Sequence, residues 1–204
     1  SIILENVAKR GGSAMRIFYR RMIVLAFIGA LHLMFIWSGD ILLLYALLGM
    51  LLPFFRKLSD RILLTVASVL LFVPVVIDFL CEATQTALSA PVVQMQQMFC
   101  ARFGITDDNF AYWLRDASSY KEVFQFLIQG ALVRIQEFID GNRYFKVLGL
   151  FIIGFIIGRQ HLYARIEEKR MWLKKVFGAG ILVGVPVSVL YAYSAMNSHP
   201  WGLA

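Results

Sequence analysis

The residue best suited to do chemistry is His32, a histidine inside a long stretch of uncharged, mostly apolar residues. A histidine in such a place must find a polar partner, and it rarely stays there without a role. Because imidazoles change protonation near neutral pH, His32 is a candidate general base. The alternative is a structural histidine that bonds to a neighbouring helix.

Asp40 lies about two helical turns after His32 in the sequence. It comes directly after Ser38-Gly39 and shortly before a run of leucines. An aspartate there caps a new helix, because its carboxylate accepts unpaired backbone N–H groups and favours the positive end of the helix dipole. The same carboxylate could orient the imidazole of His32. We therefore take His32 and Asp40 as the catalytic candidates, and Tyr45 as a weaker, substrate-binding one.

The surroundings of these residues predict a membrane protein. Hydrophobic residues make up 59% of the 204-residue chain and charged ones 16%, whereas soluble domains average roughly 45–50% and 25%. Apolar runs at 41–55 and 62–77 carry no charge and no polar stripe of the kind that buried helices of soluble proteins show. We expect an all-α, polytopic bundle of about five transmembrane helices, over residues 21–38, 41–55, 61–80, 144–159 and 172–195.

Charge predicts how this bundle is oriented. Three segments hold 14 of the 20 Lys and Arg residues, namely 1–21, 56–61 and 159–175. Basic loops stay in the cytoplasm, so we expect a multi-pass protein of the bacterial inner membrane with these segments inside. The basic pI of about 9.6 then reflects attraction to anionic lipid headgroups rather than to nucleic acid.

Residues 81–143 should form an outer segment between two membrane parts, 1–80 and 144–204. Within it, apolar residues from Tyr120 to Asp140 recur at helical spacing, which predicts an amphipathic helix lying on the membrane or on the bundle. Arg134 falls in its apolar half. It either snorkels to the interface or faces the bundle interior, where a charge marks a site, and we take it as a second substrate-binding candidate.

Some chemistries find no support in the sequence. It has no phosphate-binding loop, no H-E-x-x-H, no C-x-x-C and no G-x-S-x-G, so we expect no metal site and no bound cofactor. Cys81 and Cys100 both fall in the outer segment, and either a disulfide or two free thiols fits the sequence.

One stretch resembles the YeiB family of bacterial inner-membrane proteins. The shared pattern is R-R, then G-x-x-H, then W-x-G-D-I-L-x-x-Y-A; it corresponds to residues 20–21, 29–32 and 37–46. A second stretch, 148–159 with the later Gly184-Val185-Pro186, resembles the opening of that family's C-terminal domain of unknown function. Family members carry further helices at both ends, so we expect a piece of a longer protein.

The resemblance implies transmembrane acyl transfer. Such proteins pass an acyl group from cytoplasmic acyl-CoA to a glycan or lipid acceptor outside, and the cytoplasmic arginines or Arg134 would attract the anionic donor. Two alternatives stay open, a solute or lipid transporter with broken helices at Pro74 and Pro186, and a membrane subunit without chemistry. The acyl group, the acceptor and the oligomeric state cannot be read from the sequence.

Overall fold

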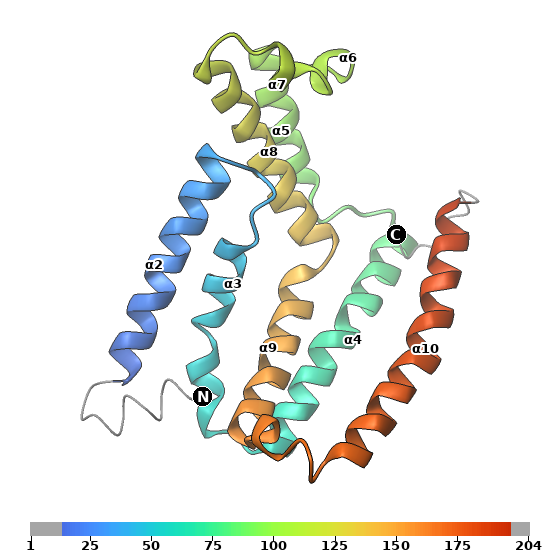
Figure 1. The fold of residues 1–204 in the computed structure, drawn as a ribbon. Coiled ribbons are helices and arrows are strands. Elements are labelled where there is room, and N and C mark those ends of the chain that lie inside the picture. The colour runs from blue at the N-terminus through green and yellow to red at the C-terminus, as the bar shows by residue number, and fades with distance from the viewer. Residues whose placement is uncertain (1–13, 197–204) are drawn as a thin grey trace.

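The computed structural model describes residues 14–196, and this part contains helices and no strand (Figure 1). In chain order the elements are α2 (Ala14–Phe35), α3 (Leu42–Gly49), the 3-10 helix η1 (Leu52–Lys57), α4 (Asp60–Thr84), α5 (Ala90–Phe103), α6 (Asp107–Phe110), α7 (Trp113–Asp116), α8 (Tyr120–Asp140), α9 (Arg143–Arg159), the 3-10 helix η2 (Leu162–Arg165) and α10 (Arg170–Met196).

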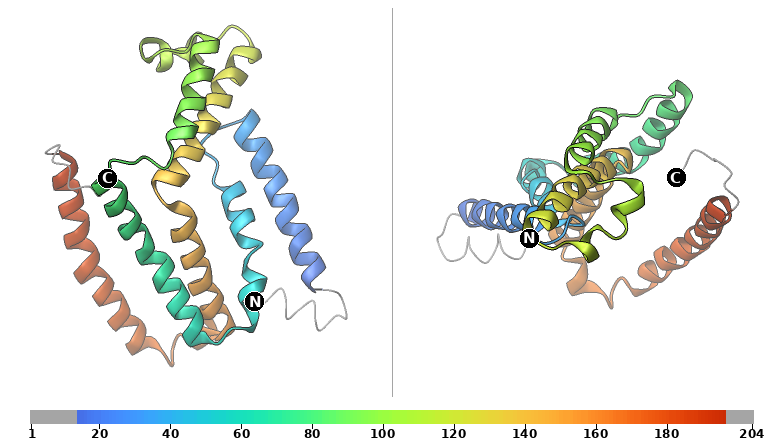
Figure 2. Two further views of the ribbon diagram at one scale, coloured as in Figure 1. Left: turned by 180° about the vertical axis from the view of Figure 1, so that it is seen from behind. Right: turned by 90° about the horizontal axis from the view of Figure 1, so that it is seen from above.

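Four helices stand side by side in the order α2, α3, α9 and α4, and each packs on the next (Figure 1). Helices α5 to α8 rise from one end of this row, and we call them the cap. Helix α10 stands apart from the row in both further views (Figure 2). Of the part of α10 that could span a membrane, no residue is buried.

Three helices are long and apolar enough to cross a membrane, over Met15–Phe35, Asp60–Thr84 and Arg170–Tyr193. A fourth crossing arises if α8 and α9, which meet at a 66° bend, count as one broken span. These helices indicate a membrane protein. The predicted number of about five transmembrane helices is not confirmed.

The predicted helix over residues 41–55 is wrong as a continuous element. Helix α3 ends at Gly49, and after a short break the chain continues as η1. Pro53 explains the break, because a proline has no N–H to donate to the carbonyl four residues earlier, and its ring clashes with that carbonyl. Here that carbonyl belongs to Gly49, the last residue of α3.

The amphipathic helix predicted from Tyr120 to Asp140 is confirmed as α8, with the same bounds. It packs on α5 and α2 and stands above the bundle instead of lying flat (Figure 1). Gln129, which belongs to the polar half of this amphipathic helix, is nevertheless buried and accepts a hydrogen bond from Gln96 Nε2 on α5 at 3.2 Å. The partner helix α5 covers this side of α8, and the sequence analysis did not foresee α5.

The tightest packing lies between α4 and α9, where Leu63, Ala67 and Ile152 are fully buried. Gly149 makes this contact possible, because a Cβ on it would lie 3.2 Å from the carbonyl oxygen of Ala67. Gly154 and Gly158, spaced four residues apart on the same helix, make no such close approach among the described residues, since a Cβ on either would meet nothing within 4 Å.

The structure also answers the questions that the sequence left open about the cysteines and the prolines. Cys81 and Cys100 are free thiols, on α4 and α5. Helices α4 and α10 continue through Pro74 and Pro186, so neither proline marks a broken helix.

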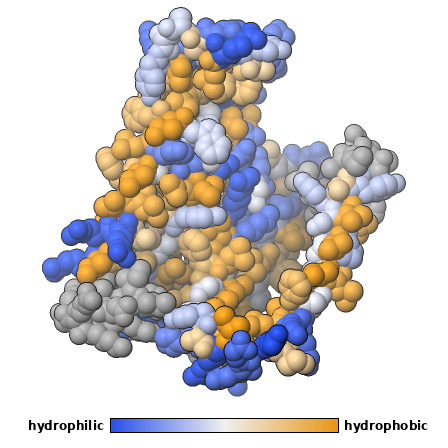
Figure 3. Space-filling model, in the orientation of Figure 1, coloured by the Kyte–Doolittle hydropathy of each residue, from blue (hydrophilic) through white to orange (hydrophobic). Residues whose placement is uncertain are grey.

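Hydrophilic residues gather at the end of the bundle opposite the cap (Figure 3), where η1, η2 and the start of α10 lie. The basic segments predicted to share one side of the membrane therefore share one end of the molecule; residues 1–13 lie outside the described part.

Candidate functional site

His32 and Asp40 meet where the bundle joins the cap. His32 lies in the last turn of α2, and the chain then reverses through residues 36–41, which brings Asp40 back towards it. His32 Nδ1 lies 3.2 Å from Asp40 Oδ1. The two atoms are out of line for a hydrogen bond, and Nδ1 is buried without any other partner among the described residues. An imidazole edge therefore lies close to a carboxylate, and the two form an ion pair when His32 is protonated.

The exposure of the two side chains differs in a way that suits catalysis. The Asp40 side chain is 2% exposed and that of His32 is 30% exposed. Because Nδ1 itself is buried, the accessible part of His32 is the remainder of the side chain. A buried carboxylate behind a half-buried imidazole is the arrangement that orients a general base.

Asp40 also caps the first turn of α3 with its side chain, as the sequence predicts, although Ile41 is the residue directly before the helix. Its Oδ2 accepts a hydrogen bond from the backbone N–H of Leu43 at 3.0 Å. This bond satisfies an unpaired amide in the first turn of the helix, where negative charge is also favoured by the helix dipole. Asp40 thus caps α3 through one oxygen and contacts His32 through the other, so the two roles weighed from the sequence coexist.

Arg134 reaches this turn from α8. Its Nη2 donates to the carbonyl oxygen of Gly39 at 2.8 Å, and its Nε donates to that of Asp40 at 3.1 Å. Its Nη1 pairs with Glu137 at 2.5 Å. Only 13% of the Arg134 side chain is exposed, so it points into the protein towards the turn instead of snorkelling outward. The sequence could not foresee these partners because they lie 94 and 95 residues away.

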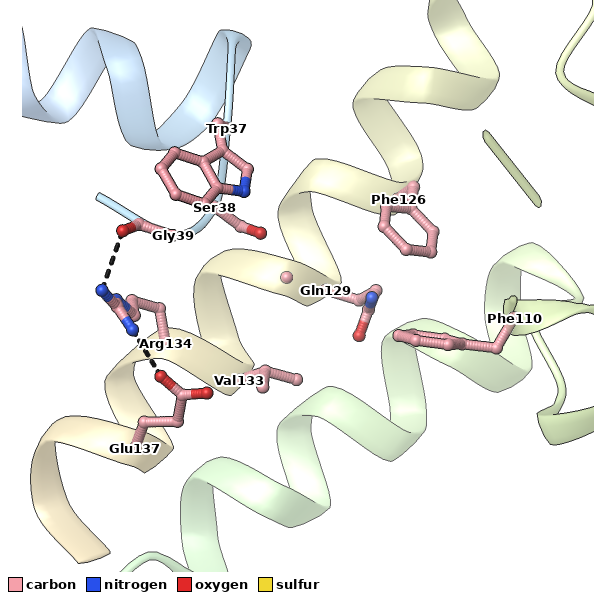
Figure 4. A pocket seen from close by; sticks show the side chains of 10 residues that line it. Trp37, Ser38, Gly39, Phe110, Phe126, Gln129, Val133, Arg134 and Glu137 are labelled. Atoms are coloured by element: carbon pink, nitrogen blue, oxygen red, sulfur yellow. Dashed lines mark hydrogen bonds and ion pairs between the residues drawn. The ribbon is translucent and has the colours of Figure 1, made fainter. Parts of the chain in front are cut away.

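A pocket of about 160 Å³ opens beside the turn (Figure 4). Trp37 lies on one side, Phe110 and Phe126 on the other, and the Arg134–Glu137 pair closes one end. The remaining lining residues come from the turn and from α8, namely Ser38, Gly39, Gln129, Gly130 and Val133. Sequence analysis missed this pocket, because it needs α6 and α8 to converge on the turn.

Tyr45 is the candidate that the structure leaves outside this group. Its ring packs edge-on against Phe151 of α9, with centroids 5.5 Å apart. Within the described residues its hydroxyl makes no hydrogen bond, and no hydrogen bond or ring contact joins Tyr45 to His32 or Asp40. A role in binding substrate next to His32 therefore stays a prediction without geometric support.

A second polar cluster lies at the bend between α8 and α9. Asn142, fully buried and in the left-handed conformation with φ 48°, donates to Asp78 Oδ1 on α4 at 2.6 Å. Asp140 accepts a hydrogen bond from Ser89 at 2.8 Å. The run Asp140-Gly141-Asn142 is a turn signal and could have located the bend, but not its partners. This cluster ties the bend between α8 and α9 to α4 and to the start of α5.

The comparisons with known proteins add little about chemistry. The chain is similar to an uncharacterised protein, YxaH of Bacillus subtilis (strain 168), with 25% identity over 202 residues. The match covers 94% of this chain and 47% of YxaH, so the chain spans about half the length of this curated relative. No protein-family description matches the chain, and no solved structure is similar to it.

Proposed function

We propose that the chain is part of an integral protein of the bacterial inner membrane that transfers an acyl group from a cytoplasmic donor to an acceptor on the other side. The observation that carries the proposal is the contact of the half-buried imidazole of His32 with the buried carboxylate of Asp40. Neither side chain lines the pocket, but the turn between them does, through Trp37, Ser38 and Gly39. The resemblance to the YeiB family supports the same reaction class. In this proposal the basic end faces the cytoplasm.

The chemical step follows from this arrangement. The free nitrogen of His32 takes the proton of an acceptor hydroxyl, and the hydroxyl oxygen attacks the carbonyl carbon of the acyl thioester. The carbon–sulfur bond breaks, the thiolate leaves, and the imidazolium returns its proton to it. Asp40 stabilises the imidazolium while it exists.

The donor would approach from the basic end. Arg20 and Arg21 line a shallow groove on α2 together with Val24, Leu25 and Ile28. Guanidinium groups bind phosphate and carboxylate, so these arginines suit the anionic head of the donor, and its thioester would have to reach further along α2 to His32. This supports acyl-CoA as the donor and the glycan or lipid acceptor at the cap end.

The test is transfer of a labelled acyl group from acyl-CoA to membrane glycans or lipids, in vesicles that carry the protein. Removing a general base costs about 10²–10⁴-fold in rate, so His32→Gln should lower transfer at least 100-fold. His161→Gln at the other end of the bundle is the matched control and should retain activity. Equal transfer by wild type and His32→Gln would refute the catalytic role.

One observation favours a transporter as the second candidate. The α8–α9 pair is broken by a 66° bend with a buried polar residue, Asn142, at the break, and broken helices flank substrate sites in many transporters. Solute or lipid movement by reconstituted vesicles without acyl-CoA would favour it. Normal function of the double variant His32→Ala, Asp40→Asn would instead indicate a subunit without chemistry.

A further inference from the structure

One face of α8 packs along the segment that joins His32 to Asp40. The Tyr120 hydroxyl donates to the carbonyl oxygen of Phe35 at 2.8 Å, and Phe124 stacks on the ring of Phe35 with centroids 5.4 Å apart. Further along the helix, Gly130 and Arg134 face the turn. At about 100° per residue these four α8 positions fall within an arc of about 120°.

The approach at Gly130 is especially close. A Cβ added to this glycine would lie 2.6 Å from Ser38 Oγ and 2.7 Å from Ser38 Cβ. Only a residue without a side chain lets α8 come this near to the turn. Arg134, one turn further on, then reaches the two carbonyl groups of Gly39 and Asp40.

The charges are arranged so that Arg134 does not compete for the Asp40 carboxylate. Its positive charge is paired with Glu137, and its contacts with Asp40 go to the backbone carbonyl. The two carboxylate oxygens of Asp40 are left to His32 Nδ1 and to the Leu43 N–H. Three of the five N–H groups of the guanidinium are engaged within the chain.

We infer that Arg134 is a positioning residue: it fixes the Gly39–Asp40 backbone and so holds the Asp40 carboxylate against His32. The cap thereby completes a site whose two reactive side chains lie on α2 and before α3. The inference rests on the proposed function only for its catalytic meaning, since the positioning itself is a property of the fold.

The test reads the tautomer of His32 by ¹⁵N NMR, in protein with labelled histidine reconstituted in lipid nanodiscs. A signal lost in His32→Gln assigns the residue. A carboxylate facing Nδ1 favours the tautomer with the proton on Nδ1, so this form should dominate in the wild type. Asp40→Asn gives the reference without the carboxylate, because an amide can donate to Nδ1 and favour the other tautomer.

Arg134→Gln should move the tautomer ratio at least half of the way from wild type to the Asp40→Asn reference, and Arg134→Lys should move it less. Arg115→Gln removes another cap arginine, which pairs with Asp116, and should leave the ratio unchanged. If Arg134→Gln does not fold, Gly130→Ala supplies the same displacement of the turn. A wild-type ratio in a folded Arg134→Gln or Gly130→Ala protein would overturn the inference.

The two proposals fail separately. If the ratio responds to Arg134 but no acyl group is transferred, the proposed function falls and the positioning role stands. If transfer depends on His32 while its tautomer ignores Arg134, the positioning role falls alone.

Discussion

At the scale of single residues, Gly29 decides how close α2 and α3 come. A Cβ on Gly29 would lie 2.5 Å from the backbone nitrogen of Leu43 and 3.0 Å from its Cα. Backbone atoms cannot move aside as a flexible side chain can, so Gly29→Ala should force the helices apart and cost about 1–3 kcal/mol of stability. Thermal unfolding in detergent should show a lower midpoint.

Gly154 is the matched control, because it also lies within a helix but a Cβ on it would meet nothing within 4 Å. Gly154→Ala should be neutral or stabilise by up to about 1 kcal/mol, since alanine favours a helix over glycine. If both substitutions lowered the midpoint equally, the close approach at Gly29 would not be what matters.

The residue scale also shows what the sequence could reveal about the site. His32 and Asp40 were found because a polar residue inside an apolar run has few explanations, and their proximity follows from a short turn. Arg134 stood out for the same reason, but its partners at Gly39 and Asp40 did not. Contacts between segments more than 90 residues apart leave no periodicity in the sequence, so the pocket between the turn, α6 and α8 stayed unseen.

At the scale of elements, the sequence predicted a helix correctly where a single physical effect decided whether the helix forms. Helix α8 was predicted with its bounds because its apolar residues recur at a helical period over 21 residues. The segment 41–55 was predicted as one helix because its hydrophobicity is uniform, although Pro53 opposes a continuous helix. Hydropathy indicates which segments are stable in lipid. It does not indicate whether a helix continues, which here depends on the missing N–H of a proline.

Replacing that proline should therefore extend α3. In Pro53→Ala the amide of residue 53 can donate to the Gly49 carbonyl, which removes a penalty of about 3 kcal/mol for a proline inside a helix. We expect slower amide hydrogen exchange over residues 50–57. Pro91→Ala, in the first turn of α5, should leave exchange unchanged because a proline is tolerated there. Unaltered exchange in Pro53→Ala would mean that packing, not the proline, ends α3.

At the scale of the whole molecule, η1, η2 and the start of α10 lie at one end, and the cap stands at the other (Figure 1). The elements at the first end carry basic residues. Positive charge is retained in the cytoplasm, which predicts that the cap, the pocket and His32 lie towards the outer side. Labelling of single cysteines in oriented membrane vesicles checks this. Cys81 and Cys100 are first replaced by serine, and the fold should tolerate this because neither thiol is in a disulfide.

Two exposed positions then report the two ends, Ala111 in the cap and Lys169 at the basic end. A membrane-impermeant maleimide should label Ala111→Cys in right-side-out vesicles and Lys169→Cys in inverted ones. After detergent both should label equally, which controls for local reactivity. The reverse pattern would place the basic end outside and remove the basis for a cytoplasmic donor. Labelling of both in intact right-side-out vesicles would show that the chain does not separate the two ends across a bilayer.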